Sequence, residues 1–421
     1  MVFEVGIGTS QSWDPKEAAG EAVTQASQSL TQKPTFILVF CTIHYEKDKG
    51  FNQILERVYH DFSEQTPLIG GTVTGFINKQ GCFTRGVTVA LFFSDEIDFI
   101  FGIGKNTKRS PLKAARECVA GIKKFNFRFR NKFLLLFSSG PSYPIVPGVG
   151  KIKVVKNPLF GLLLPIFVKF STIFLQKGLG REQEIAEEIR QELPGFDVFG
   201  GSTNDDNNYT RNYQFFFDKV KLNCVLGLGI STNLKVDITG ADGMIGRGIK
   251  GKIKKTSMWG YMIHDFDGIN AQKKYLAANG WDESILDNFI HRKTIYYPIG
   301  IYFPDGVLHP YPVPIFTGRE IILGDSARGN TYEFLTTSGK SLVDSADQSL
   351  KYADNSLFLF GVACAVSLEA LGRNVYKIRE KILPKTKDFL LIYMVGETRG
   401  KAGQYVHQFQ ETINFLSLKR Q

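Results

Sequence analysis

The first half of the chain contains an internal repeat. The segment that begins at Glu4 aligns without a gap, at a constant offset, with the segment at residues 99–119. Gly6, Ile7, Gly8, Pro15, Ala18, Ala19, Glu21 and Val23 recur in the same order as Gly102, Ile103, Gly104, Pro111, Ala114, Ala115, Glu117 and Val119. A duplicated unit constrains the fold strongly, because the two copies are expected to form the same strands and helices in the same order.

Both copies carry the signals of a strand followed by a helix. Asp14 and Ser110 are residue types that cap helix N-termini, and each is followed by a proline, Pro15 or Pro111, at the first helical position. The alanines that follow recur at helical spacing and form one apolar face. We therefore predict two equivalent helices that begin at these prolines.

The correspondence continues downstream of the helices. The apolar runs 36–42 and 133–139 have the length of buried strands, and an amphipathic helix pattern follows each of them. The glycine-containing segments 67–76 and 197–206 and the strands 86–93 and 222–230 then complete the pairs. The pattern predicts an α/β fold in which two pseudo-symmetric αβαββ repeats form the N-terminal domain, followed by a second α/β domain.

The repeat also sets the expected domain boundaries. We expect an N-terminal domain at residues 1–232, made of copies 1–97 and 98–232, with an insertion of about residues 141–180 in the second copy. A basic Gly/Lys-rich connection, 233–260, leads to a C-terminal domain at 261–421. The connection contains GxGxxG and GxxxxGK patterns, but no apolar strand precedes them, and Ile253 stands where a phosphate-binding loop needs Ser or Thr. Nucleotide binding is therefore not indicated.

The formal net charge of +10 is concentrated in one region. Residues 118–181 hold eleven Lys and Arg and no Asp or Glu, and they include the apolar segment 159–175. That segment is too short to span a bilayer, whose core of about 30 Å needs ~20 helical residues. Three interpretations stay open: contact with an anionic membrane, contact with a partner or a second copy, and packing on its own domain. The expected contact residues are Lys151, Lys153, Lys156, Leu163, Phe167, Lys169, Phe170 and Lys177.

Cysteine and histidine usage argues against several other classes. The five cysteines are widely separated and form no CxxC pair, and the six histidines show no metal-binding spacing. We therefore expect no metal site and a reducing compartment. The N-terminal residues lack the basic and apolar regions of a signal peptide, so the expected location is cytoplasmic, with peripheral association at the inner membrane face as an alternative. The alternation of Phe125, Phe127 and Phe129 with arginines also fits a single strand, so nucleic acid is not a favoured partner.

Several motifs in fixed order resemble the FIST family, whose N-terminal and C-terminal sensory domains occur together in bacterial and archaeal signalling proteins. The resemblance covers nearly the whole chain. It rests on the order of the matching motifs along the chain more than on any single motif. The matching pieces are Ile69-Gly70-Gly71-Thr72, Phe199-Gly200-Gly201-Ser202 with Asp205-Asp206, Asp265-Phe266-Asp267-Gly268 with Ala271, Ala363-Cys364, Val395-Gly396-Glu397, and His407 to Thr412.

The resemblance implies a non-catalytic protein that binds a small metabolite, such as an amino acid, and signals to a downstream protein in trans. It also implies haem as a ligand of some members; the cofactor of this chain is otherwise unknown. The family tends to carry an arginine where this chain has Ser367, which puts an amino-acid ligand in doubt. An unrecognised enzyme and a membrane scaffold remain alternative functions, and a homodimer remains an alternative assembly.

The residue types at these motifs suggest a ligand site at the strand ends. Glycines let a backbone approach a ligand closely, but they equally serve tight packing between the two copies. Polar residues after strands are common ligand contacts in α/β proteins, although solvated turns use them too. The candidate ligand-binding residues are Gly70, Gly71, Thr72, Gly200, Gly201, Ser202, Asn204, Asp205, Cys364 and Glu397. Cys364 also fits a packed apolar position, and no catalytic residue is proposed.

Overall fold

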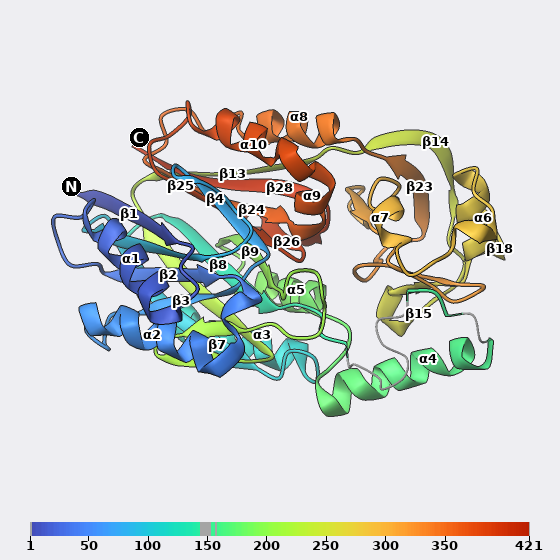
Figure 1. The fold of residues 1–421 in the computed structure, drawn as a ribbon, viewed down its shortest axis with the longest axis horizontal. Helices are drawn as coiled ribbons and strands as arrows, with labels where there is room; N and C mark the ends of the chain where they lie inside the picture. The colour runs from blue at the N-terminus through green and yellow to red at the C-terminus, as the bar shows by residue number, and fades with distance from the viewer. Residues whose placement is uncertain (1, 144–152, 156–157, 421) are drawn as a thin grey trace.

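The computed structural model describes residues 2–143, 153–155 and 158–420, and within the helix that begins at Pro158 the side chains of 158–160 and 162 are not described. It confirms the predicted α/β class (Figure 1). One order of elements recurs three times along the chain, as a strand, a helix, a strand, a helical segment, a strand, a hairpin and a closing strand. We refer to these stretches as the first, second and third units.

The first and second units follow the predicted repeat closely in the order of their elements. The first unit contains β1 (Phe3–Ser10), α1 (Pro15–Ser27), β2 (Phe36–Cys41), α2 (Gly50–Asp61), β3 (Leu68–Thr72), β4 (Gly75–Asn78), β5 (Gly81–Phe83) and β6 (Val87–Ser94). The second contains β7 (Ile97–Lys105), α3 (Pro111–Lys124), β8 (Asn131–Ser139), α4 (Pro158–Phe170), α5 (Glu182–Glu192), β9 (Asp197–Thr203), β10 (Gln214–Phe216), β11 (Lys219–Lys221) and β12 (Cys224–Thr232).

The third unit is interrupted by a long inserted segment between its first strand and its first helix. The unit contains β13 (Lys235–Asp242), α8 (Gly339–Ser349), β24 (Phe358–Cys364), α9 (Ala365–Leu371), α10 (Val375–Ile382), β25 (Phe389–Met394), β26 (Glu397–Gly400), β27 (Val406–Phe409) and β28 (Thr412–Lys419). The inserted segment contains β14 (Ile245–Lys252), β15 (Thr256–Ser257), β16 (Met262–Ile263), β17 (Asp265–Phe266), β18 (Ile269–Asn270), α6 (Ala271–Ala278), α7 (His291–Thr294), β19 (Ile299–Tyr302), β20 (Leu308–Tyr311), β21 (Ile315–Phe316), β22 (Ile321–Ile322) and β23 (Thr331–Thr336).

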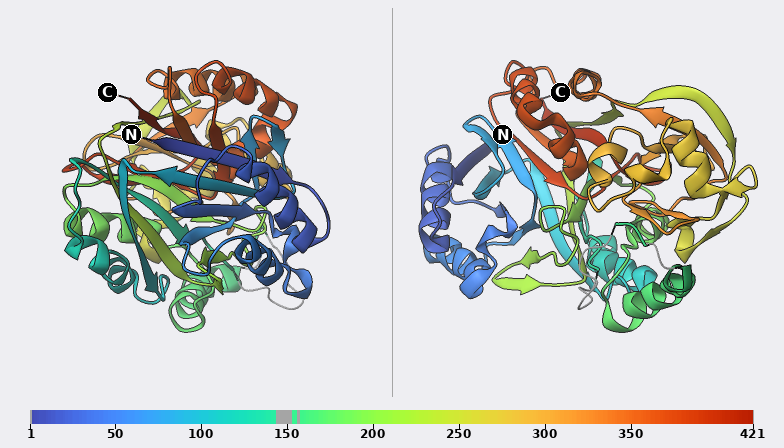
Figure 2. Two further views of the ribbon diagram at one scale, coloured as in Figure 1. Left: turned by 90° about the vertical axis from the view of Figure 1, so that its left-hand side faces the viewer. Right: turned by 45° about the vertical axis from the view of Figure 1, so that its right-hand side comes forward.

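Each unit contributes strands to two sheets. The three larger sheets have the orders β1-β6-β2-β3-β10-β11, β7-β12-β8-β9-β26-β27 and β13-β28-β24-β25-β4-β5. In every sheet, the hairpin at one edge therefore comes from another unit. The hairpin of the second unit joins the first sheet, that of the third unit joins the second sheet, and that of the first unit joins the third sheet. In the left view of Figure 2, the blue, green and red parts of the chain lie around a common centre. Because each large sheet contains strands of two units, the exchange links the three units through backbone hydrogen bonds. The predicted domain boundaries stay a prediction.

Three equivalent backbone hydrogen bonds close this cycle at its centre. The N–H groups of Thr74, Asn204 and Val395 donate to the carbonyl oxygens of Tyr393, Thr72 and Ser202 respectively, each at 3.0 Å. Each donor lies two residues after the acceptor residue of its own unit. The GG-[ST] motifs of the first two units thus have a counterpart near Tyr393 in the third unit.

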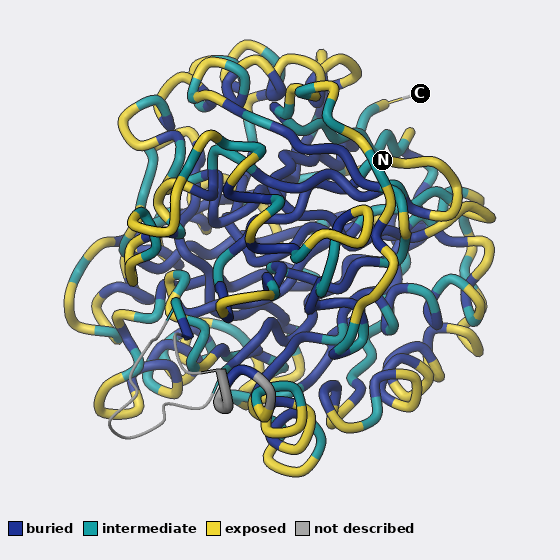
Figure 3. The backbone as a smooth tube through the Cα atoms, turned by 90° about the vertical axis from the view of Figure 1, so that its right-hand side faces the viewer, coloured by how far each residue is buried: buried dark blue, intermediate teal, exposed yellow. Residues whose placement is uncertain are grey.

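The core lies between the inner faces of the three sheets. One apolar cluster combines residues from all three, and Phe40, Phe137 and Phe360 contact one another there with ring centroids 5.3 to 6.3 Å apart. Helices α1 and α2 cover the outer face of the first sheet, α3 and α5 that of the second, and α8 and α10 that of the third. Figure 3 shows the buried stretches running through the middle of the molecule.

The repeated Gly-Ile-Gly motif is explained by close packing of a strand against a helix. A Cβ at Gly8 would lie 1.8 Å from the carbonyl oxygen of Ala22, and one at Gly104 would lie 1.7 Å from that of Ala114. Only glycine permits this approach of β1 to α1 and of β7 to α3. Asp14 caps α1 as predicted, by accepting a hydrogen bond from the Glu17 N–H, whereas Ser110 precedes α3 without a side-chain cap bond.

The insertion of the second unit forms a helix at the edge of the molecule. Helix α4 continues into a π-helical turn at Ser171–Leu175. In Figure 1 this helix lies below the inserted segment, near β15, and away from the three large sheets. No helix within the described ranges is both long and apolar enough to cross a membrane.

Candidate functional site

A cavity of about 510 Å³ lies where the second unit, α4, α9 and the inserted segment meet. Its wall is mostly apolar and includes Leu164, Phe167 and Val168 from α4, Ile295 and Ile315 from the inserted segment, and Val366 from α9. Pockets of about 300–1,000 Å³ with apolar walls and a few polar groups are the usual form of small-molecule sites. The chain therefore builds this cavity from segments that are far apart in the sequence.

The loop after β9 supplies one polar wall. Asn207, Asn208, Tyr209 and Thr210 line the cavity. Asp206, Asn207 and Tyr209 have left-handed φ angles of 60°, 53° and 54°, which are unfavourable for a residue such as tyrosine. An additional interaction must therefore hold this loop in place.

Asp205 provides that interaction. Its buried carboxylate accepts hydrogen bonds from the N–H groups of Tyr209, Thr210 and Arg211 at 2.6, 2.8 and 3.0 Å. It also accepts one from the Thr210 hydroxyl at 2.6 Å. Asp205, predicted as a ligand contact, thus has a role in positioning the loop that forms the cavity wall.

Charged groups gather at another side of the cavity. Lys153, Arg292, Glu369 and His291 all line it. The pKa of His291 is lowered, mainly by burial and then by the charge of Lys153, while Glu369 acts in the opposite direction. The three charged side chains therefore lie close enough to influence one imidazole. Two cations and one carboxylate beside an apolar wall suit a small molecule that carries both an anionic and a cationic group.

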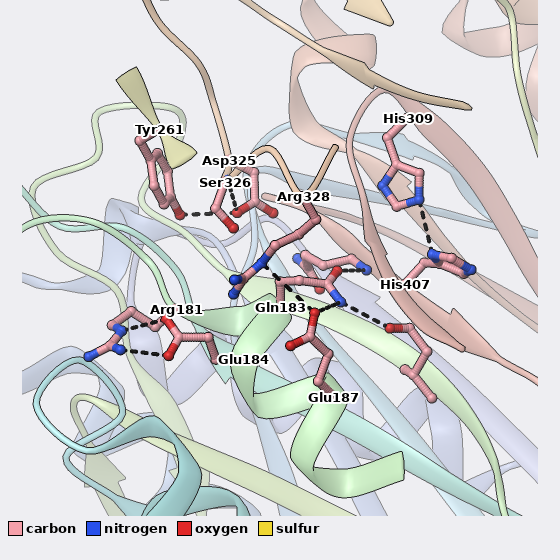
Figure 4. A network of polar contacts seen from close by, with 12 residues as sticks. Arg181, Gln183, Glu184, Glu187, Tyr261, His309, Asp325, Ser326, Arg328 and His407 are labelled. Carbon is pink, nitrogen blue, oxygen red and sulfur yellow. Dashed lines mark hydrogen bonds and ion pairs between the residues drawn. The ribbon is translucent and has the colours of Figure 1, made fainter. Parts of the chain in front are cut away.

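Buried polar groups lie behind the cavity floor. Gln410 lines the cavity and hydrogen-bonds the Asp325 carboxylate, which also contacts the Tyr261 hydroxyl at 3.1 Å. Burial raises the pKa of Asp325 to about 6. Figure 4 shows Tyr261 and Asp325 together, with His309 and His407 at 3.0 Å in a separate contact. Of these groups only Gln410 lines the cavity, and it connects the cavity wall to the buried Asp325 carboxylate.

The predicted glycine corners are packed against neighbouring chain. A Cβ on Gly70 would lie 1.8 Å from the Val39 carbonyl oxygen, and one on Gly200 would lie 1.8 Å from that of Leu136. Gly71 and Gly201 are likewise close to atoms of adjacent strands. The structure places all four glycines inside the sheets, away from the cavity wall. Ligand contact at these glycines stays a prediction.

The polar residues that follow the glycines lie at the closing hydrogen bonds of the three units. Thr72 and Ser202 accept two of those bonds with their carbonyl oxygens and are fully buried. Asn204 Oδ1 accepts a hydrogen bond from the Thr74 hydroxyl at 2.8 Å. Ser202 is not among the described residues that line the cavity. Its carbonyl oxygen accepts a hydrogen bond from the N–H of Val395, which does line it.

The structure brings Cys364 and Glu397 together, as a buried cluster with Glu411. Burial raises the pKa of the Glu397 carboxyl to about 8, although Thr412 donates to its Oε2 from the N–H and the hydroxyl at 3.1 and 2.8 Å. Burial and the nearby charge of Glu397 also raise the pKa of Glu411. Cys364, Glu397 and Glu411 are not among the described residues that line the cavity. Ser367 follows Val366, so the position where the family carries arginine lies beside the cavity wall.

The predicted contact residues of the insertion divide into three groups. Lys153 and Phe167 line the cavity. Leu163, Lys169, Phe170 and Lys177 are exposed. Lys151 and Lys156 lie outside the described residues. The cavity residues that sequence reasoning missed are His291, Arg292, Glu369 and the loop 207–210; the polar run after Asp205 was the one signal that could have drawn attention to that loop.

The donor groups around the cavity decide whether it could hold a metal or a haem. Among the described residues, no cluster of three or more His, Cys, Asp and Glu could hold a metal ion. Haem needs an axial side chain such as His, Met or Tyr, and His291 and Met258 both line the cavity. If haem bound here, His291 or Met258 would be the candidate to hold its iron, and Arg292 and Lys153 the candidates to meet its carboxylates.

Comparison with known proteins bears on the family of the chain and not on the cavity. No curated protein matches the chain. A crystal structure of cyanuric acid hydrolase from A. caulinodans matches with a TM-score of 0.25 and 8% sequence identity, over 55% of this chain and 71% of that chain. A family model described as the FIST N domain matches residues 35–269, which is more than half of the chain. The resemblance of 261–421 to a C-terminal FIST domain stays a prediction. The chain belongs to the FIST family of sensory, signal-transduction domains.

Proposed function

We propose that this protein is a non-catalytic sensor that binds a small amino-acid-like molecule in the cavity between α4, α9 and the inserted segment, and signals to a downstream protein. The observation that carries the proposal is the combination of an apolar wall with Lys153, Arg292 and Glu369. The cations would bind the ligand carboxylate, Glu369 its ammonium group, and the apolar wall its side chain. Arg292 offers a guanidinium at the cavity, whereas Ser367, where the family resemblance implies an arginine, is not among the described residues that line it.

The ligand class is tested by isothermal titration calorimetry with apolar and aromatic amino acids, their deamino analogues and haem. We expect an apolar amino acid to bind, and Glu369→Gln to weaken it by about tenfold while leaving the deamino analogue unchanged, because a charge-assisted hydrogen bond is worth roughly 1.5–3 kcal/mol. If no compound binds, or if Glu369→Gln affects both ligands equally, the proposed ligand chemistry is wrong.

The location of the site is tested by two matched substitutions on α4. Leu164→Trp places a larger side chain in the cavity wall, whereas Leu163→Trp makes the same change at the next residue, which is 58% exposed and does not line the cavity. We expect binding to be lost with Leu164→Trp and retained with Leu163→Trp. Equal affinities in the two variants would place the site elsewhere.

A second matched pair tests the anion-binding side chain. Arg292→Gln removes a guanidinium that lines the cavity, and Lys293→Gln removes the neighbouring exposed cation, which does not line it. Arg292→Gln is expected to weaken a carboxylate ligand at least as strongly as Glu369→Gln weakens an amino acid. The proposal requires Lys293→Gln to behave as the unmodified protein.

A further inference from the structure

The outer face of α4 is an exposed apolar stripe. Leu163, Ile166, Phe167, Phe170 and Phe174 follow helical spacing, and their exposed fractions are 58%, 68%, 44%, 53% and 59%. Residues at i, i+3, i+4, i+7 and i+11 lie on one side of a helix. Large apolar side chains gathered on one exposed surface usually mark an interaction site. We call these five residues the outer face of α4.

The opposite side of the same helix is fixed to the body of the protein. Val168, Ser171 and Thr172 are buried, and the Thr172 hydroxyl donates to the Val168 carbonyl oxygen at 2.7 Å. The Leu179 N–H in turn donates to that hydroxyl at 3.2 Å. The Arg109 guanidinium donates to the carbonyl oxygens of Ile173 and Phe174 at 3.0 and 2.9 Å, which satisfies the end of the helix. The outer face is therefore held on a well-anchored helix.

Lysine and arginine side chains flank the outer face, and Glu184 lines a small hollow together with Lys169. Lys169, Lys177 and Arg109 are exposed beside it, and residues 118–181 contain no Asp or Glu. Among the described residues, neither Lys169 nor Lys177 forms an ion pair. Lys169 Nζ lies 5.5 Å from the Trp259 ring centroid. Apolar side chains flanked by lysines are the arrangement of helices that lie in the headgroup region of anionic membranes. A second copy of this chain would bring the same positive charges together, which disfavours self-association through this face.

We propose that the outer face of α4 docks on an anionic lipid surface, with its apolar side chains in the headgroup region and Lys169 and Lys177 against the lipid phosphates. Because α4 lies at the edge of the molecule (Figure 1), the large sheets do not obstruct this contact. Phe167 belongs both to the outer face and to the cavity wall. Docking therefore places one wall of the cavity at the lipid surface.

Flotation with vesicles tests the proposal on the full chain. We expect the protein to float with phosphatidylcholine vesicles that contain phosphatidylserine, and much less with phosphatidylcholine alone. Ile166→Ser with Phe170→Ser should reduce the bound fraction by about tenfold or more, because each change removes an apolar side chain from the contact. Lys169→Glu with Lys177→Glu should reduce it as well, and high salt should weaken binding by the unmodified protein.

A control substitution separates docking from general surface hydrophobicity. Tyr376 lies on α10, at the far side of the molecule from α4 in Figure 1, and is 57% exposed. Tyr376→Ser should float as the unmodified protein does, and thermal unfolding should show that all variants are folded. Failure of the unmodified protein to bind the anionic vesicles, or equal flotation of the outer-face variant, would overturn the proposal. A dimer that the outer-face variant dissociates, without vesicle binding, would assign this face to self-association instead.

Discussion

Removal of the Asp205 carboxylate should release the loop that forms one wall of the cavity. The carboxylate accepts four hydrogen bonds, three from backbone N–H groups and one from the Thr210 hydroxyl. A hydrogen bond to a charged group contributes roughly 1.5–3 kcal/mol. The simple sum overstates the effect, because Asp206, Asn208 and Arg211 are exposed and water can replace part of these contacts. We expect Asp205→Ala to lower the free energy of unfolding by about 3 kcal/mol.

Two measurements define the expected result. Urea unfolding gives the change in stability, and hydrogen exchange gives the protection of the Tyr209, Thr210 and Arg211 amides, which should fall most strongly. The left-handed φ angle of Tyr209 should relax once its N–H has no acceptor. Asp206→Asn is the matched control, because it removes the exposed carboxylate next in the chain while Asn tolerates the left-handed φ angle of 60°. It should leave both measurements nearly unchanged.

The same variant separates two roles for Asp205. If Asp205 acts by holding the loop, ligand affinity and amide protection should fall together, and Asp205→Asn should show a smaller loss of both. If Asp205 contacts the ligand directly, affinity should fall while protection of residues 209–211 is retained. Unchanged protection in Asp205→Ala would refute the reasoning about the loop.

Two further predictions concern stability. Gly104→Ala on β7 should destabilise the protein by about 3 kcal/mol or more, because its Cβ would lie 1.7 Å from the Ala114 carbonyl oxygen of α3. Gly121→Ala, in an open position on α3, should stabilise it by about 0.5–1 kcal/mol, and equal urea midpoints for the two variants would contradict the packing argument. Burial and the charge of Glu397 raise the Glu411 pKa above its ordinary value of 4.5, so the folded state holds a proton that the unfolded chain loses as the pH rises. Stability should then fall as the pH rises above about 5, by up to ~1.4 kcal/mol per pH unit for this group, and Glu411→Gln should flatten that slope in urea titrations; an unchanged slope would show that Glu411 is ionised in the folded protein.

The sequence predicted the local elements of the first two units because their signals are local. The prolines at 15 and 111, the apolar strands and the spacing of the amphipathic helices depend only on neighbouring residues, and the structure confirms these elements. The third unit was not predicted, because the inserted segment separates β13 from α8 and removes the constant offset that revealed the first repeat. The counterpart of the GG-[ST] motifs near Tyr393 is recognised only from the hydrogen bonds that close the units.

The cavity depends on contacts that no local pattern records. Leu164, Arg292 and Glu369 come from α4, the inserted segment and α9, and only the tertiary fold brings them to one wall. The charge concentration at 118–181 and the apolar segment 159–175 were evident from composition, but which side chains of that segment are exposed was not. Composition and spacing did not show that Lys153 and Phe167 line a cavity, because the surroundings of a side chain depend on which distant segments pack against it.

The most direct test of the cavity as the sensory site is a crystal structure of the protein with the amino acid that binds most tightly. We expect ligand density between α4, the loop 207–210 and Ile295, with the carboxylate near Arg292 or Lys153 and the ammonium near Glu369. Density at the glycine corners near Gly71 or Gly201, with the cavity empty, would contradict it.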